Sequence, residues 1–385
     1  MFYPRLLKTV GMILGACVLG ACGEVSQADR EMQAAPLLTT AELQSKLSEI
    51  HTARPEVPGF AISVVLPDQT IISASSGVAA PDETPMTPRT PVRLASTSKT
   101  FVAAAILRLA EQDQLNIDAS IENYVSDNVL ELLRQDGYVT ASITLRHLLL
   151  HAGGLHDHFQ SPDYQLMALS NPDRVWTAYD QLTMFVETTD KLSEPGEAYF
   201  YSDPGFILLG LTLEHVTQQS MGQAVRDLLK LDDLGLAGSW WEGEQSPPDS
   251  SARAHQWLGD YDAYYVHGSV DAFGGGGLIA SMEGTAQFFH ALFSGRVFAD
   301  EQTLAAMVEG QGHPEDSPYR FGLFVNEHAG YQIYGHSGFW GTDAIAVPEL
   351  SIAIASVALD QDGLDAMLEL EGELIELIGQ RIKLD

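Results

Sequence analysis

Residues 91–112 read PVRLASTSKTFVAAAILRLAEQ, a β-rich run that leads into an amphipathic pattern. Apolar residues recur with helical spacing over 97–112, so we expect a helix there, after a short strand at 91–94. Ser96 and Lys99 stand three positions apart at the start of this helix and therefore face the same side. A lysine held against a serine hydroxyl can take its proton and make the oxygen a nucleophile. By themselves, the same residues also fit an ordinary capped helix start.

Two further motifs lie far along the chain. Tyr201-Ser202-Asp203 precedes a helical pattern at 204–217, and a phenol near a lysine can pass protons to and from a nucleophile. His336-Ser337-Gly338 ends a β-rich run, where a glycine lets the backbone approach a ligand and an exposed strand can pair with an extended substrate. Each motif also has an ordinary structural explanation, with Asp203 as the N-cap of the next helix and the glycine motif as a β-turn.

The order of the three motifs, S-x-x-K, Y-x-[ND] and [KH]-[ST]-G, is more specific than any one of them. With these motifs the chain resembles the serine β-lactamase and DD-peptidase superfamily. Within it, the chain is most similar to the branch of class C β-lactamases, DD-carboxypeptidases, D-aminopeptidases and β-lactamase-like esterases. The runs 143–155 and 195–210 and the triplet Gly276-Gly277-Leu278 support the resemblance, which covers residues 39–385.

The resemblance implies a serine hydrolase that forms an acyl-enzyme at Ser96 on an amide or ester substrate. Lys99 and Tyr201 would activate Ser96 and protonate the leaving group, and which of the two is the base stays open. The backbone N–H groups of Ser96 and Phe339 would form the oxyanion hole. No cofactor and no metal are implied. Four more residues would contact the substrate: Asp203, His336, Ser337 and Gly338.

Two residues depart from the class C β-lactamase pattern. His336 stands where those enzymes have lysine, so the permanent cation that faces a substrate carboxylate is lost and efficient β-lactam hydrolysis is disfavoured. His336 would act either as a cation or as a neutral imidazole. Asp203 stands where many members have asparagine. A carboxylate cannot donate a hydrogen bond to a substrate carbonyl, but it can pair with Lys99 and keep it charged.

The substrate stays open between a D-Ala-D-Ala peptide, a D-amino-acid amide, a short ester and a β-lactam. We expect an activity like that of the DD-carboxypeptidases, D-aminopeptidases or esterases. The alternatives are a class C-like β-lactamase and a non-hydrolytic penicillin-binding or sensor protein. The intact set of Ser96, Lys99 and Tyr201 favours an enzyme over an inert scaffold.

The remaining patterns predict an α/β (α+β) fold. Thr39 and Glu42 form a capping box before a first helix, and 59–66 and 70–78 read as a β-hairpin. We expect one antiparallel sheet from N- and C-terminal segments, helices on both of its faces, and an inserted, mainly helical lobe at about 113–265. The late part of the chain carries β patterns at 319–325, 331–335, 344–347 and 351–358. The clearest helices of the middle lie near 143–151, 177–188, 204–217 and 221–230. An amphipathic helix ends the chain.

The N-terminus predicts export and lipid anchoring. Arg5 and Lys8 precede a short apolar stretch, and Leu19-Gly20-Ala21-Cys22 resembles a lipobox whose cysteine is lipidated. We therefore predict a signal peptide at 1–22 and a flexible tether at 23–38, rich in small and polar residues. The expected location is the cell envelope, facing the periplasm, and Gly23 after the cysteine favours the outer membrane. The alternative is an ordinary secretory signal.

Charge and cysteine content exclude several classes of function. The net charge of −32 repels phosphate backbones, so we expect no nucleic-acid partner and a small-molecule or peptide substrate instead. The only cysteines, Cys17 and Cys22, cannot staple the fold. Four histidines within twelve residues leave a metal site as a weaker alternative to buried structural histidines: His147, His151, His156 and His158.

Overall fold

The computed structural model describes residues 36–188, 190–248 and 252–384. The predicted signal peptide, Cys22 and all but the end of the predicted tether lie outside the described residues. Leu38 is 2% exposed and packs in the same apolar cluster as Leu43 and Leu47. The folded body is therefore Leu37–Leu384 and begins earlier than the predicted boundary at 39.

The helices and strands follow the predicted order along the chain. The helices are α1 Thr40–Ala53, α2 Ser98–Glu111, α3 Asp127–Gln135, α4 Leu145–Leu149, α5 Pro162–Ser170, α6 Ala178–Thr188, α7 Asp203–Thr217, α8 Met221–Leu229, α9 Met282–Phe293, α10 Glu301–Glu309 and α11 Leu364–Ile382. The strands are β1 Gly59–Val65, β2 Ile71–Gly77, β3 Val92–Arg93, β4 Trp240–Trp241, β5 Trp257–Leu258, β6 Tyr261–Asp262, β7 Leu278–Ala280, β8 Phe324–His328, β9 Tyr331–Gly338, β10 Thr342–Val347 and β11 Ile352–Ala358.

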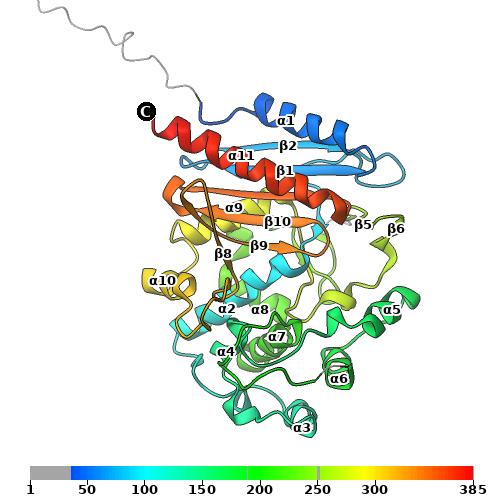
Figure 1. Ribbon diagram of the computed structural model, residues 1–385, viewed down its shortest axis with the longest axis vertical. Coiled ribbons are helices and arrows are strands. Elements are labelled where there is room, and N and C mark those ends of the chain that lie inside the picture. Colours follow the sequence, from blue (N-terminus) through cyan, green and yellow to red (C-terminus); the bar gives the residue numbers. More distant parts are fainter. Residues whose placement is uncertain (1–35, 189, 249–251, 385) are drawn as a thin grey trace, which may run out of the picture. The chain divides into compact units, whose positions relative to one another are not determined.

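The main sheet is antiparallel and joins the two ends of the folded body, as predicted. Its strand order is β2-β1-β11-β10-β9-β8, and β1 pairs with β11 so that Ile62 lies opposite Ser356. Helices α1 and α11 cover one face and α9 packs on the other (Figure 1). Successive residues of β1 alternate between the two cores, because strand side chains point to opposite faces. Ile62 and Val64 pack under α11, while Ala61 and Val65 pack on the side of α2 and α9.

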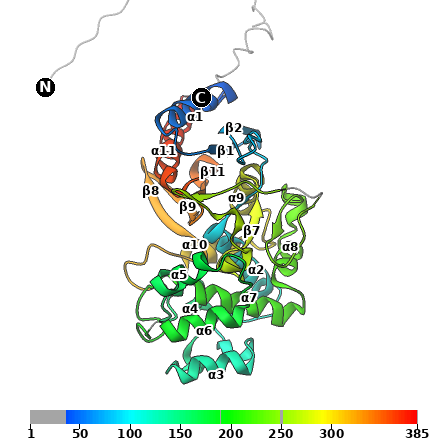
Figure 2. The same cartoon turned by 90° about the vertical axis from the view of Figure 1, so that its right-hand side faces the viewer.

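The inserted lobe holds α3 to α8 and lies at the far end of the body from α1 and α11 (Figures 1 and 2). It is not purely helical, since Trp240–Trp241 pairs with β7 in a three-stranded sheet of order β3-β7-β4. The capping box at Thr39 and Glu42 forms as predicted, with Glu42 N–H donating to Thr39 Oγ1 at 3.2 Å.

One predicted strand is displaced. Residues 319–323 form a turn instead of a strand, with Arg320 N–H donating to Leu323 O at 2.7 Å and Gly322 in the left-handed region at φ 75°. The strand β8 starts only at Phe324. Tyr319 is fully buried before this turn and forms an isolated antiparallel bridge with Phe324. In the described part of the chain, every helix is too short or too polar to cross a bilayer.

Candidate active site

Ser96 lies in a single 3-10 turn, Ala95–Thr97, between β3 and α2. From Val92 to Thr100 every residue is buried except Ser96, so its hydroxyl is the one that a substrate can reach. Ala95 adopts φ 47°, a left-handed conformation that costs energy for any residue but glycine. Strain of this kind next to an accessible serine is a common mark of a functional turn.

The end of β9 is held against this turn. Thr97 Oγ1 donates to His336 O at 2.9 Å, and Thr342 Oγ1 donates to Leu94 O at 2.9 Å. A Cβ at Gly338 would lie 2.1 Å from Leu94 O, so only glycine permits this approach. The structure thus brings the predicted site residues Ser96 and Gly338 close together.

Lys99 is fully buried and directs its ammonium at three acceptors. Its Nζ lies 3.0 Å from Ser96 Oγ and 2.6 Å from Asp203 Oδ1, and it also donates to Gly275 O. An ammonium group has three protons, so this set satisfies it. The predicted pairing of Asp203 with Lys99 is present.

Asp203 does not cap the helix that follows it. The N-cap of α7 is Ser202, whose Oγ accepts from Gly205 N at 3.3 Å. Asp203 is the first helical residue and its carboxylate turns to Lys99. Of the two roles left open by the sequence, the structure therefore supports the ion pair.

Tyr201 completes the group around Ser96. The pKa of its phenol is raised well above 10 by burial and then by the charge of Asp203, and a hydrogen bond with Ser96 lowers it only in part. Lys99 Nζ lies 5.0 Å from the centre of the Tyr201 ring. The His151 ring packs 4.3 Å from that of Tyr201, and His151 Nδ1 accepts from Ser202 N at 3.1 Å. His151 therefore fixes the position of the tyrosine motif.

His336 is a neutral imidazole. Its Nδ1 lies 2.7 Å from Ser337 O and its Nε2 lies 3.0 Å from the Tyr319 hydroxyl. A carbonyl oxygen only accepts, so Nδ1 carries the proton and Nε2 accepts from Tyr319. Burial, followed by the charge of Lys99, lowers the pKa of His336 to about 3. The structure therefore favours the neutral role over that of a cation.

The structure separates Ser337 from the other predicted contact residues. Its Oγ donates to Asp343 Oδ1 at 2.5 Å, because side chains alternate along β9 and Ser337 faces the side of α11. Its predicted contact with substrate through the side chain is not supported. Phe339 directly follows β9 and packs 5.0 Å from the Phe159 ring.

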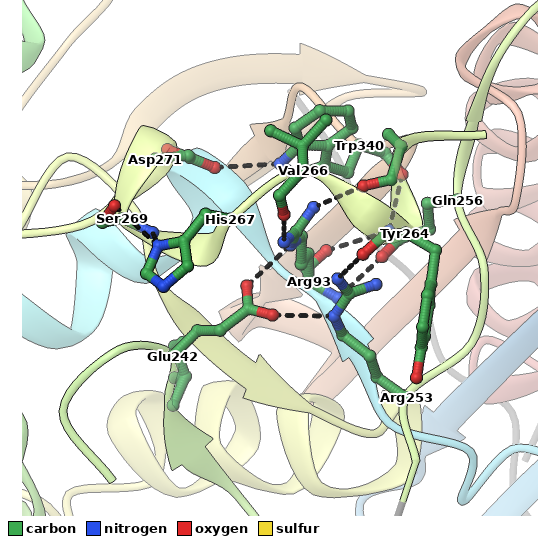
Figure 3. Close-up of polar contacts among 12 residues, drawn as sticks. Arg93, Glu242, Arg253, Gln256, Tyr264, Val266, His267, Ser269, Asp271 and Trp340 are labelled. Atoms are coloured by element: carbon green, nitrogen blue, oxygen red, sulfur yellow. Dashed lines mark hydrogen bonds and ion pairs between the residues drawn. The ribbon is translucent and has the colours of Figure 1, made fainter. Parts of the chain in front are cut away.

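Two further carboxyl groups surround the Lys99–Asp203 pair. The pKa values of Asp157 and Asp271 are each raised to about 7, first by burial and then by the charge of Asp203. Asp271 accepts from Trp340 Nε1 at 3.0 Å (Figure 3) and is only half-buried. A Cβ at Gly276 would lie 2.2 Å from Asp271 Oδ1, so the glycine run packs directly on this carboxyl. This end of the site is acidic.

An apolar cavity of about 290 Å³ adjoins the end of β9. Phe339 and Trp340 line it on one side and α5 on the other. The same aromatic cluster includes Ala95, the neighbour of Ser96. Other residues of its wall are Phe159, Tyr164, Val266 and Val270. The cavity is therefore lined mainly by apolar side chains and lies beside Phe339, one of the two predicted oxyanion donors.

The four clustered histidines have separate surroundings. His147 Nδ1 accepts from Thr144 N at 3.2 Å in a capping box, while His151 packs on Tyr201. Burial lowers the pKa of His158 to about 4, and its ring packs 4.6 Å from that of Tyr164. Within the described ranges, no three His, Cys, Asp or Glu side chains are arranged to hold a metal ion.

The sequence analysis missed several residues of the site. Asp157 and Tyr319 lie in loops, and Asp271 ends the 3-10 helix Gly268–Asp271. None of the three belongs to a recognisable motif, so only the fold brings them to the site. His151 stands in the run 143–155 that supported the resemblance, and its place in that run was the one available signal.

The comparisons with known proteins concern the family and the fold of the chain. The family model described as Beta-lactamase matches residues 47–371. The chain belongs to the β-lactamase family. It also has the fold of the serine β-lactamases and DD-peptidases, as the sequence predicted.

Relatives of this β-lactamase-family protein differ in length and name. "Protein flp" of Staphylococcus aureus (strain MW2) is 27% identical over 172 residues, which are 44% of this chain and 32% of that protein. The chain thus matches about a third of the length of that curated relative. A "Putative D-alanyl-D-alanine carboxypeptidase" of Escherichia coli O157:H7 is 24% identical over 306 residues, 69% of this chain and 68% of that protein.

Two solved structures show the same fold. The D-amino acid amidase from Ochrobactrum anthropi SV3, in complex with L-phenylalanine amide, superposes with a TM-score of 0.72 at 23% identity, over 88% of this chain and 97% of that chain. The D-stereospecific amidohydrolase from Streptomyces sp. superposes with a TM-score of 0.70 at 22% identity, over 83% and 94%.

Proposed function

We propose that this protein is an exported serine amidase that forms an acyl-enzyme at Ser96. Its substrates would be amides of D-amino acids with a free amino group and an apolar side chain. The contact of Ser96 Oγ with Lys99 Nζ at 3.0 Å, beside Tyr201, supports the serine mechanism. The acidic end of the site supports the substrate class, because it would attract the ammonium group of the substrate.

The proposed reaction has two stages. The Lys99–Tyr201 pair first loses one proton to solvent. Ser96 Oγ then attacks the amide carbonyl while its proton passes to the vacant position on that pair, and the backbone N–H groups of Ser96 and Phe339 stabilise the oxyanion. The C–N bond then breaks and the leaving amine takes up the proton. Water attacks the acyl-enzyme through the same groups, releases the acid and returns the proton to Ser96.

Charge favours an ammonium over a carboxylate on the substrate. DD-carboxypeptidase and β-lactam substrates carry a carboxylate near the scissile bond, and His336 is neutral. Lys99 is paired with Asp203, and Arg93 is paired with Glu242. Asp271 is half-buried, and its negative charge would attract an amine on the substrate. The two structural neighbours are a D-stereospecific amidohydrolase and a D-amino acid amidase, which favours the D configuration.

The pH dependence of binding follows from Asp271. Its pKa is raised to about 7, so it gains its negative charge as the pH rises through 7. An ammonium substrate should therefore bind more tightly above pH 7 than below it. Binding should weaken again as the substrate's amino group loses its proton near pH 8.

A substrate panel on soluble protein lacking residues 1–22 tests the proposal. We expect the highest kcat/KM with D-phenylalanine amide, compared with L-phenylalanine amide, a peptide ending in D-alanyl-D-alanine, p-nitrophenyl acetate and a penicillin. Ser96→Ala should abolish all turnover. Retention of a tenth of wild-type turnover would exclude Ser96 as the nucleophile. Preference for the D-alanyl-D-alanine peptide or the penicillin would contradict the substrate class.

Asp271→Asn separates ammonium recognition from catalysis. Asparagine still accepts from Trp340 but has no charge, so KM for D-phenylalanine amide should rise about 10-fold, the effect of roughly 1.4 kcal/mol. The variant should also lose the fall in KM through pH 7. Turnover of p-nitrophenyl acetate, which has no ammonium, is the matched control and should change far less. Equal KM changes for both substrates would contradict the role of Asp271.

We also propose that the protein is held in the cell envelope by a lipid on Cys22. The basic n-region, the short apolar stretch and the lipobox-like sequence support this. Several acyl chains on one cysteine anchor a protein stably, whereas a single chain binds only marginally. An anchored amidase would meet its substrates in the periplasm.

A further inference from the structure

The two proposed oxyanion donors come from different sheets. The Ser96 N–H follows β3, the edge strand of the three-stranded sheet. The Phe339 N–H follows β9 of the six-stranded sheet. The spacing of the two donors therefore depends on how these sheets are joined at this point, and an oxyanion hole tolerates little error in that spacing.

The side chain of Gln256 is a third link between them, in addition to the hydrogen bonds of Thr97 and Thr342. Its Oε1 accepts from Arg93 N at 2.8 Å, and its Nε2 donates to Arg93 O at 3.0 Å and to Trp340 O at 2.8 Å. Figure 3 draws Gln256 together with its partners Arg93, in β3, and Trp340, in the turn after β9. The opposite amide orientation would set an NH₂ against an N–H and an oxygen against two carbonyls, so these contacts admit only one orientation.

Gln256 acts as a substitute strand at the open edge of β3. Arg93 pairs with β7 on one side, and on the other its N–H and C=O both bond to the Gln256 amide, as they would to a neighbouring backbone. The same amide reaches Trp340 in the turn after β9. One side chain thus connects a point three residues before Ser96 with the residue after Phe339.

Gln256 is itself held rigidly. It is 1% exposed, and its own backbone carbonyl accepts from Ala263 N at 3.0 Å. The residues before and after it are tied to the rest of the fold, with His255 N donating to Ala79 O at 2.8 Å and Trp257 N donating to Leu359 O at 2.7 Å. A fixed backbone makes the amide a spacer of defined length.

The charged network around Gln256 supports its partners without replacing it. Glu242 bridges Arg93 and Arg253, with O–N distances of 2.6 and 2.8 Å (Figure 3). The Arg93 guanidinium lies 5.5 Å from the Trp340 ring, and Asp271 accepts from the Trp340 indole. These contacts fix side chains, whereas Gln256 holds the backbone of both strands.

We propose that Gln256 is a positioning residue that sets the spacing of the two oxyanion-hole donors, Ser96 N–H and Phe339 N–H. This inference rests on the proposed serine hydrolase function. Loss of the Gln256 amide would leave Ser96, Lys99 and Tyr201 in place but let the two donors move apart.

Gln256→Leu tests the proposal in the soluble protein. Loss of one oxyanion donor lowers kcat by about 100- to 1,000-fold in other hydrolases, so a displaced donor should lower kcat by roughly 10- to 100-fold, with KM nearly unchanged. The discriminating readout is an ester compared with its thionoester, in which sulfur replaces the carbonyl oxygen. A well-formed hole strongly prefers oxygen, and the oxygen-to-sulfur ratio of kcat/KM should fall about 10-fold in the variant.

Gln181→Leu is the matched control. Gln181 is 2% exposed, and its Nε2 donates to the carbonyls of Ser269 at 2.6 Å and Val270 at 3.2 Å, away from both donor segments. Its loss should lower Tm but leave the oxygen-to-sulfur ratio as in the wild type. An equal fall of the ratio in both variants would show a general packing effect and overturn the role of Gln256.

Gln256→Glu repeats the test with a side chain of the same shape. It keeps the acceptor for Arg93 N–H but turns a carboxylate oxygen toward two carbonyls, so the ratio should fall here as well, even if the leucine variant does not fold. A wild-type ratio in either folded variant overturns the proposal. If the folded wild-type protein hydrolyses neither ester, this result contradicts the proposed function. The positioning role of Gln256 is then also contradicted, because it rests on that function.

Discussion

At the scale of one residue, the contacts of Lys99 determine whether it can accept the proton of Ser96. Its ammonium contacts Ser96, Asp203 and Gly275, so it must lose a proton before it can take one from Ser96. Tyr201 is held in its protonated form by burial and by the charge of Asp203. Asp203 therefore acts on both candidate bases: it contacts Lys99 and raises the pKa of Tyr201.

We expect Asp203→Asn to shift the alkaline rise of kcat/KM to lower pH. The negative charge of Asp203 raises the pKa of Tyr201, so removing it lowers that pKa and the phenolate forms at lower pH. A charge at short range shifts a pKa by about 1–3 units, so the shift should be at least about 1 pH unit. The measurement is kcat/KM against pH with p-nitrophenyl acetate.

Asp157→Asn serves as the control for Asp203→Asn. The charge of Asp157 also raises the pKa of Tyr201, but by less than that of Asp203, so its shift should be smaller in the same direction. Superimposable profiles for wild type and Asp203→Asn, with only a lower Tm, would assign Asp203 to the fold alone.

At the scale of elements, a buried pair of carboxyl groups joins α11 to the sheet. Glu371 of α11 lies against Asp343 of β10, beside a cavity of about 450 Å³ behind β9. Burial, and then the charge of Asp343, raises the pKa of Glu371 well above 4.5. A raised pKa means that the folded protein binds a proton that the unfolded chain releases, so this stability is present below pH 4.5 and is lost as the pH rises through the folded pKa.

Glu371→Gln should therefore stabilise the protein increasingly as the pH rises. Glutamine keeps a donor for Asp343 but cannot ionise, so the Tm difference between variant and wild type should grow from pH 5 to pH 9. Each pKa unit corresponds to about 1.4 kcal/mol. Glu373→Gln is the control on the same helix. It removes an exposed ion pair with Lys46, which contributes about 0–1 kcal/mol. A Tm difference for Glu371→Gln that is constant with pH would contradict the raised pKa of Glu371.

At the scale of the whole molecule, we propose separate tasks for the folded body and the N-terminal segment. The catalytic groups all lie within Leu37–Leu384, and the net charge of −32 keeps such a body away from anionic surfaces. Attachment to a membrane would then depend on the lipid that we propose for Cys22.

Cys22→Ser should move the protein from the membrane fraction to the soluble periplasmic fraction, with kcat/KM unchanged. The reason is that the anchor lies outside the catalytic body. Cys17→Ser is the matched control, since it changes the other cysteine of the chain and should leave the protein in the membrane fraction. If Cys22→Ser still sediments with membranes, the lipobox interpretation is wrong.

The sequence by itself determined the family, the nucleophile motif and the order of the elements. These depend on patterns between neighbours in the chain: the S-x-x-K spacing on one helix face, the alternation of β1 and β11, and the capping box before α1. Such patterns involve only residues that are close together in the sequence, so they can be recognised without knowledge of the fold.

The tertiary structure alone decided the electrostatics of the site. His336 is neutral because burial, followed by the charge of Lys99, lowers its pKa to about 3. Asp271 has a raised pKa because burial and the charge of Asp203 act on it together. The amide of Gln256 bonds to Arg93 in β3 and to Trp340 in the turn after β9, two segments that are distant in sequence. Burial and charge are sums over all the groups that surround a residue, and only the folded chain determines which groups those are.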